Sequence, residues 1–250
     1  MMKKLLVFCL LCVATFGLAQ DSALFDQGKA NYKAEQYLQA IQNWKKVLDN
    51  GNHSAALYFN IANAYYKLNE VGPSIFYYEK ALQLAPNDTE IKTNLAFAEN
   101  ARVDAIEPLP TSVFSKWYSS AAGLFHYDGW ALLSVFFSSA FVILFLVYYF
   151  VHQENKKRLF FTLSLLSVVF CLTAFTMAYM TYNDVQKDQP AIVFTEEIEI
   201  KAEPKLNSST VFTLHEGTKV QILENDGDWL RISIANGKDG WIPVSDLKKL

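Results

Sequence analysis

The sequence has few of the residues from which catalytic and metal sites are built. Its 250 residues include only three cysteines and four histidines. They are scattered: Cys9, Cys12 and Cys171 lie in apolar stretches, and His53, His126, His152 and His215 lie in four different parts of the chain. No metal-ligand spacing, phosphate-binding loop or nucleophile motif occurs. The sequence therefore predicts no enzyme, no metal and no cofactor.

Clusters of one charge sign are also absent. Residues 20–110 carry 8 Lys/Arg and 11 Asp/Glu, and residues 190–250 carry 7 and 10. Because binding to phosphate backbones needs clustered Lys and Arg, nucleic-acid binding is disfavoured. Charged residues make up only 19% and hydrophobic residues 52%, against about 25% and 45–50% in soluble domains. The apolar excess is concentrated between Trp130 and Met180, which indicates a membrane segment between soluble parts.

The first 19 residues have the pattern of a secretory signal peptide. A basic start, an apolar stretch over Leu5–Gly17 and small residues at Gly17 and Ala19 follow one another. A lipoprotein signal is not indicated, because Cys12 follows two leucines. The alternative is an uncleaved anchor helix, for which the stretch is short. We expect a cleaved signal peptide over residues 1–19.

Residues 20–108 repeat with a period of 34 residues, which aligns Tyr32 with Tyr66 and Trp44 with Tyr78. Apolar residues at helical spacing predict two helix–turn–helix units, 21–54 and 55–88, and a capping helix over 89–103. The second unit resembles the tetratricopeptide repeat family. The residues that carry this resemblance are Tyr58, Ile61, Ala62, Tyr65, Ser74, Tyr78, Ala81 and Pro86. The first unit is weaker, because Gln27 and Asn31 replace apolar residues.

This resemblance implies a concave face, formed by the first helix of each pair, that binds extended peptides. The candidate groove residues are Phe25, Lys29, Tyr32, Lys33, Phe59, Asn63, Tyr66, Lys67, Thr93 and Phe97. The basic residues with which some relatives bind a carboxyl terminus are missing, since Phe25, Glu90 and Asn94 stand at those positions. The alternative is that these aromatic residues contact each other or the membrane-proximal segment.

Two runs, 130–151 and 159–180, contain no Asp, Glu, Lys, Arg or His. At about 1.5 Å rise per residue each is long enough to span a bilayer as a helix; the alternative is a buried core helix. The loop 152–158 holds Lys156, Lys157 and Arg158, so it is expected on the cytoplasmic side. The predicted location is therefore the bacterial inner membrane, with the N- and C-terminal domains periplasmic. The absence of charge within the spans disfavours a transporter.

The segment before the first run, 111–127, is predicted to be an interfacial amphipathic helix. Its apolar residues recur at helical spacing: Val113, Phe114, Trp117, Ala121, Leu124 and Phe125. Hydroxyl groups within the spans could join the two helices or bond within their own helix. These are Ser138, Ser139, Thr162, Ser164, Ser167, Thr173 and Thr176.

Residues 190–250 change to the alternating pattern of β-strands. About five short strands are expected, with hairpin turns at 225–228 and 236–237. The segment resembles bacterial SH3-like domains in Leu214–Gly217, Asp228-Trp229 and Gly240–Pro243. That resemblance implies binding of cell-wall peptides or partner proteins, with Trp229 and Trp241 as surface candidates. The alternative is that both tryptophans only pack in the core or at its rim.

The predicted fold class is multidomain: an all-α helical repeat, two transmembrane helices and a small all-β SH3-like barrel. In this order the segments resemble the BatE-like proteins of the Bacteroides aerotolerance (Bat) system of Bacteroidota, notably at 94–99 and 212–217. That resemblance implies partner membrane proteins with von Willebrand A-type domains and a MoxR-type ATPase. The functional hypothesis is an adaptor in such a complex; the alternative is a membrane protein that binds peptidoglycan peptides.

Overall fold

The computed structural model describes residues 21–250 as two compact units. One unit combines the chain up to Pro108 with Gln189–Leu250, and the other is Leu109–Asp188. The expected signal peptide, with Cys9 and Cys12, lies outside the described residues. The predicted fold class is confirmed, because a helical repeat, two long apolar helices and an antiparallel sheet are all present. The union of the helical repeat and the sheet in one unit was not predicted.

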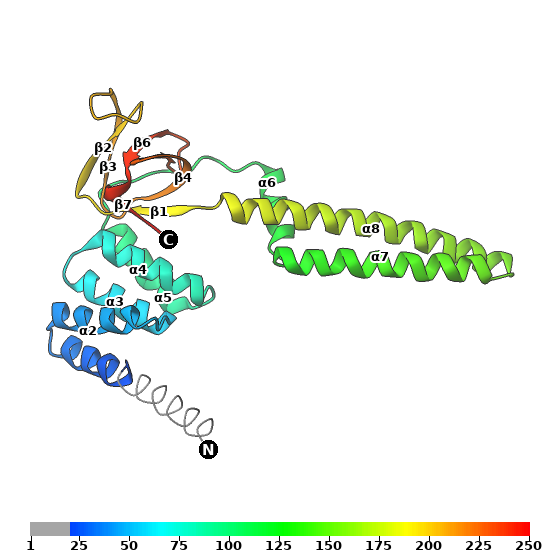
Figure 1. The fold of residues 1–250 in the computed structure, drawn as a ribbon, viewed down its shortest axis with the longest axis horizontal. Coiled ribbons are helices and arrows are strands. Elements are labelled where there is room, and N and C mark those ends of the chain that lie inside the picture. The colour runs from blue at the N-terminus through cyan, green and yellow to red at the C-terminus, as the bar shows by residue number, and fades with distance from the viewer. Residues whose placement is uncertain (1–20) are drawn as a thin grey trace, which may run out of the picture. The chain divides into compact units, whose positions relative to one another are not determined.

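The helical repeat consists of residues 21–33, α2 (Tyr37–Asp49), α3 (Ala55–Lys67), α4 (Val71–Leu84) and α5 (Thr89–Asn100) (Figure 1). The 34-residue period is visible in the backbone: Glu35 and Asn69, one period apart, have φ angles of 60° and 61°. Each stands in the turn between the two helices of a pair, where the chain reverses through a left-handed residue. Two helix starts are capped by side chains, α3 by Ser54 and α5 by Asp88.

Close packing between helices depends on small residues at fixed positions. Trp44 is fully buried, and a Cβ placed on Gly28 would overlap its indole ring. The indole instead donates a hydrogen bond to the carbonyl oxygen of Phe25 at 3.1 Å. One period further on, Ala62 stands at the position equivalent to Gly28, and the hydroxyl of Ser74 donates to its carbonyl oxygen.

The C-terminal segment is a seven-stranded antiparallel sheet with the order β3-β2-β6-β5-β4-β1-β7. Its strands are β1 (Pro190–Val193), β2 (Glu197–Lys201), β3 (Thr210–His215), β4 (Lys219–Asp226), β5 (Trp229–Ser233), β6 (Asp239–Pro243) and β7 (Leu247–Lys249). Both hairpin predictions are confirmed: β4–β5 turns at Gly227 and β5–β6 turns at Gly237, each with positive φ. The expectation of about five strands was too low, because the short strands β1 and β7 carry little alternation of their own.

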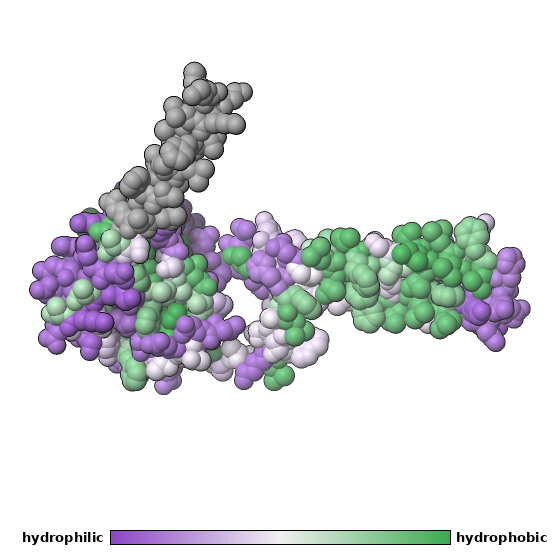
Figure 2. Space-filling model, turned by 90° about the horizontal axis from the view of Figure 1, so that it is seen from below, coloured by the Kyte–Doolittle hydropathy of each residue, from purple (hydrophilic) through white to green (hydrophobic). Residues whose placement is uncertain are grey.

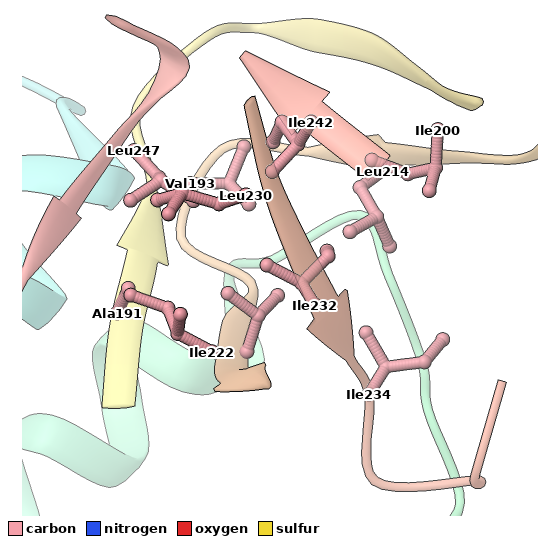
Figure 3. Close-up of a cluster of buried hydrophobic side chains, with 11 residues drawn as sticks. Ala191, Val193, Ile200, Leu214, Ile222, Leu230, Ile232, Ile234, Ile242 and Leu247 are labelled. Carbon is pink, nitrogen blue, oxygen red and sulfur yellow. The ribbon is translucent and has the colours of Figure 1, made fainter. Parts of the chain in front are cut away.

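All seven strands contribute to one apolar core. Figure 3 shows its side chains converging from different strands, among them Ile200, Leu214, Leu230, Ile232 and Ile242. Since residues from every strand share this cluster, the sheet must curl around it, as expected of a small barrel.

The helical repeat and the sheet share a second apolar cluster. Ile192 of β1 is fully buried in the cluster of α4 and α5, which Phe194 and Leu250 also join. The ring of Phe194 meets the ring of Phe76 edge-on at 5.5 Å. Polar contacts surround this junction: Lys219 forms an ion pair with Glu79 at 2.6 Å, and Glu216 accepts a 3.4 Å bond from the backbone nitrogen of Gly72. The sheet therefore covers the end of the repeat that would otherwise be exposed.

The second unit contains α6 (Val113–Ala122) and a hairpin of two long helices, α7 (Tyr127–Phe150) and α8 (Glu154–Lys187). Both are long and apolar enough to cross a membrane. Figure 2 shows hydrophobic side chains along the hairpin and hydrophilic ones at the end where the helices are joined. The connection is shorter than the expected loop 152–158, because α8 already begins at Glu154. Lys156, Lys157 and Arg158 therefore lie on the first turns of α8.

Most of the hydroxyl groups in the hairpin bond within their own helix. Thr162, Ser164, Thr173 and Thr176 donate to carbonyl oxygens three or four residues earlier, as does Ser139 in α7. Ser167 instead donates across the hairpin to the carbonyl oxygen of Phe137 at 2.7 Å. Cys171, one turn further on, lies 3.4 Å from the carbonyl oxygen of Ser134.

Candidate functional site

A cavity of about 280 Å³ lies on the face of the repeat formed by the first helices of the pairs. Its lining residues are Tyr32, Asn63, Tyr66, Lys67, Tyr78, Asn94 and Phe97. Five of these were candidate groove residues: Tyr32, Asn63, Tyr66, Lys67 and Phe97. The structure thus places side chains from residues 21–33, α3, α4 and α5 around one hollow, which we call the repeat groove.

The other five candidates do not line the repeat groove. Phe25 packs in the core with Trp44, and Phe59 packs beside Tyr78 with ring centres 5.9 Å apart. Both are therefore partly core residues. The hydroxyl of Thr93 donates to the carbonyl oxygen of its own helix at Thr89, and Lys29 pairs with Asp26. The remaining candidate, Lys33, is exposed.

Two groove residues, Tyr78 and Asn94, were not among the candidates. Tyr78 occupies a large-residue position of the repeat and is almost fully buried, but its hydroxyl reaches Asn63. Asn94 lies one helical turn before Phe97, the residue that the 34-residue period aligns with Asn63. The period therefore selected Phe97, although the neighbouring turn also faces the groove.

Hydrogen bonds fix the orientation of the amide of Asn63. Its Oδ1 accepts from the hydroxyl of Tyr78 at 2.5 Å and from Nδ2 of Asn94 at 3.2 Å. Burial, with smaller contributions from Tyr32 and Tyr66, raises the pKa of Tyr78, so its hydroxyl stays protonated and donates. Within the part of the chain that the structure describes, Nδ2 of Asn63 and Oδ1 of Asn94 have no partner.

The groove therefore offers one amide donor and one amide acceptor between aromatic walls. A polypeptide backbone presents the complementary pair, a carbonyl oxygen and an N–H group. Tyr66 and Phe97 are 40% and 57% exposed, which leaves apolar surface for side chains of a ligand. Lys67 adds a single positive charge at the rim.

The two tryptophans of the sheet lie on the outer face of β5 and β6. Trp229 pairs with Pro243 and Trp241 pairs with Arg231, while the alternating residues Leu230 and Ile242 point into the core. Both indoles are partly exposed, so neither is a core residue. Between them, Arg231 is held by Asp239 through bonds of 2.8 and 2.6 Å. This outer face is an aromatic surface with a neutralised charge at its centre.

A second hollow, lined mainly by residues of the sheet, is acidic. Its lining residues are Val103, Thr195, Glu196, Glu197, His215 and Glu216. The ring of His215 already has a partner, because its Nδ1 lies 2.8 Å from the carboxylate of Asp104. No group of three or more potential metal ligands occurs among residues 21–250.

Comparisons with known proteins agree with the presence of a helical repeat and a small β domain. The tetratricopeptide repeat family matches residues 55–88, and the bacterial SH3 domain family matches residues 197–248. A putative N-acetylmuramoyl-L-alanine amidase, YrvJ of Bacillus subtilis (strain 168), is 26% identical over 76 residues. That match covers 30% of this chain but only 15% of the amidase, and it falls on the SH3 part. The chain therefore contains a tetratricopeptide repeat and a bacterial SH3 domain, both of which are non-catalytic binding modules.

Proposed function

We propose that this protein is a membrane-anchored adaptor that holds an extended segment of a partner protein in the repeat groove. The observation that carries this proposal is the pair of unpartnered amide groups of Asn63 and Asn94. They lie at hydrogen-bonding reach of a ligand in a hollow walled by Tyr66 and Phe97. An extended backbone satisfies both groups at once, and Lys67 favours an acidic side chain beside it.

The test is quantitative co-purification from detergent-solubilised membranes with a tagged full-length chain. Changing Tyr66→Ser and Phe97→Ser together should remove most of the captured partner, because both side chains are exposed and line the groove. The matched control is Leu38→Ser with Leu84→Ser, which removes two exposed apolar side chains of the same repeat outside the groove. Equal recovery with both double variants would reject the groove as the binding site.

The location that we propose is the bacterial inner membrane, with the hairpin of α7 and α8 inserted and both binding modules periplasmic. Support comes from the length and apolar surface of the two helices and from the three basic residues at their connection. Protease added to spheroplasts should then digest the repeat and the sheet but leave a fragment containing the hairpin. Protection of the whole chain would reverse the proposed orientation.

The more specific proposal, membership of a Bat-type complex, rests on the resemblance of the sequence. The partners would be membrane proteins with von Willebrand A-type domains, working with a MoxR-type ATPase. Identification of the captured partner in the co-purification above tests this directly.

The alternative proposal is binding of peptidoglycan peptides through the SH3 domain, and the partial match to an amidase favours it. The acidic hollow at Glu196, Glu197 and Glu216 would suit the free amino groups of such peptides. Sedimentation of the full chain with purified sacculi tests this, with Glu196→Gln and Glu197→Gln expected to release it. A chain that stays in the supernatant would exclude this alternative.

A further inference from the structure

The end of the hairpin where α7 joins α8 contains a hollow of about 360 Å³. Its lining residues are Tyr148 of α7 and Glu154, Lys157, Arg158 and Phe161 of α8. The ring of Tyr148 lies 5.5 Å from that of Phe161, and Nζ of Lys157 stands 5.3 Å from the centre of the Tyr148 ring. The lining of the hollow thus combines two aromatic rings, two basic side chains and one carboxylate. Its volume lies in the range of ligand pockets, about 300–1,000 Å³.

The charge at this place is not compensated by the protein. Lys156, Lys157 and Arg158 face one acidic neighbour, Glu154, and none of the four forms an ion pair within the described residues. An excess of two positive charges therefore remains beside two apolar helices, and an excess of one remains in the lining of the hollow itself, which includes Lys157, Arg158 and Glu154. Elsewhere basic side chains do find carboxylates, as Lys219 does with Glu79 and Arg231 with Asp239.

We propose that this hollow binds the phosphodiester headgroup of an anionic phospholipid, such as phosphatidylglycerol. Lys157 and Arg158 would hold the phosphate, and the acyl chains would lie along Phe161 and the apolar surface of the hairpin. The continuity of the hollow with that surface selects a lipid rather than free phosphate, because an inorganic ion would make no use of the aromatic walls. This inference rests on the proposed insertion of α7 and α8 into a membrane.

The test is native mass spectrometry of the full chain in detergent with equal amounts of phosphatidylglycerol and phosphatidylcholine. We expect preferential retention of phosphatidylglycerol. Changing Lys157→Gln or Arg158→Gln should lower its occupancy constant at least about tenfold, because each variant loses a charge-assisted hydrogen bond to the phosphate. Lys156→Gln is the matched control, because it removes the same charge one residue away but outside the lining.

Three outcomes would overturn the proposal: no preference between the two lipids, an equal effect of all three substitutions, or full displacement of phosphatidylglycerol by millimolar inorganic phosphate. An equal effect of the three substitutions would mean that diffuse electrostatic attraction, rather than binding in the hollow, retains the lipid. Unchanged circular dichroism of each variant excludes loss of helix as the cause. Membrane insertion is measured separately, by flotation with vesicles of phosphatidylcholine alone, so its failure and that of the headgroup site are distinguishable.

Discussion

The carboxylate of Asp104 accepts hydrogen bonds from both the backbone nitrogen and the Nδ1 atom of His215, at 2.7 and 2.8 Å. The hydroxyl of Thr218 donates a third bond to it at 2.6 Å. Asp104 follows the last helix of the repeat, whereas His215 ends β3, more than a hundred residues later. One partly buried carboxylate therefore holds the turn between β3 and β4 against the end of the repeat.

The first prediction concerns Asp104→Asn. The asparagine side chain has one acceptor oxygen where aspartate has two, and its NH₂ group only donates. It therefore cannot accept all three bonds, and at least one buried donor loses its partner. We expect a loss of about 1–3 kcal/mol in the free energy of unfolding of the unit that combines repeat and sheet. Chemical denaturation of the full chain in detergent, followed by tryptophan fluorescence, measures it. Glu107→Gln, which removes an exposed charge in the same segment, should have almost no effect.

The second prediction is a dependence on pH. Burial opposes ionisation of Asp104, but the bonds from Thr218 and His215 outweigh it and hold the pKa of this carboxyl below its ordinary value of 3.8. A depressed pKa in the folded state contributes stability above the unfolded pKa, and that contribution is lost as the pH falls through the folded pKa. As the pH falls below 3.8, the free energy of unfolding should therefore decrease less in Asp104→Asn than in the unchanged protein. An equal decrease of the free energy of unfolding with falling pH in the two proteins would contradict this role.

The third prediction separates close packing from backbone strain at two glycines with positive φ. A Cβ on Gly217 would meet Ile75, Arg102 and Val71 at 3.0–3.2 Å, whereas a Cβ on Gly227 would meet nothing within 4 Å. Gly227→Ala should cost only the conformational penalty, about 1–2 kcal/mol. Gly217→Ala should cost about 1–3 kcal/mol more, because the sheet must move away from α4. Equal losses in denaturation would show that the junction tolerates the added methyl group.

The sequence predicts those parts of the fold that rest on local periodicity. The 34-residue period places the helices of the repeat, and the uncharged runs locate α7 and α8. The glycine-containing turns at Gly227 and Gly237 predict two hairpins. In each case the signal lies within one segment, because burial of one face of a helix or strand imposes a regular spacing on its own residues.

The junction between repeat and sheet could not be predicted in this way. Ile192 lies in a strand of four residues, too short for a pattern to show that it is buried against α4 and α5. The partnership of Asp104 with His215 leaves no periodic trace either. In the groove, the period aligned Tyr32 with Tyr66 and Asn63 with Phe97. Only the packing shows that Phe25 and Phe59, which are also one period apart, turn toward the core.

The fourth prediction concerns Gly28→Ala. The added methyl group would overlap the fully buried ring of Trp44, so the indole must shift and its bond to the carbonyl of Phe25 must weaken. Overpacking of this kind costs about 1–3 kcal/mol. Combining Gly28→Ala with Trp44→Phe tests the cause, since the smaller ring removes the overlapping atoms. The double variant should lose less stability than the sum of the two single losses, and strict additivity would refute a clash between them.

The last prediction follows from the shared apolar cluster. A fragment of residues 189–250 alone would expose Ile192 and Phe194, which the repeat covers in the full chain. Two fragments, 21–108 and 189–250, should therefore associate when they are mixed, whereas the SH3 fragment alone should tend to self-associate. Size-exclusion chromatography detects the complex, and Asp104→Asn in the helical fragment should weaken it, while Glu107→Gln should not. Fragments that remain monomeric and separate would mean that the junction depends on the intact chain, because joining the two modules raises their effective concentration to about the millimolar range.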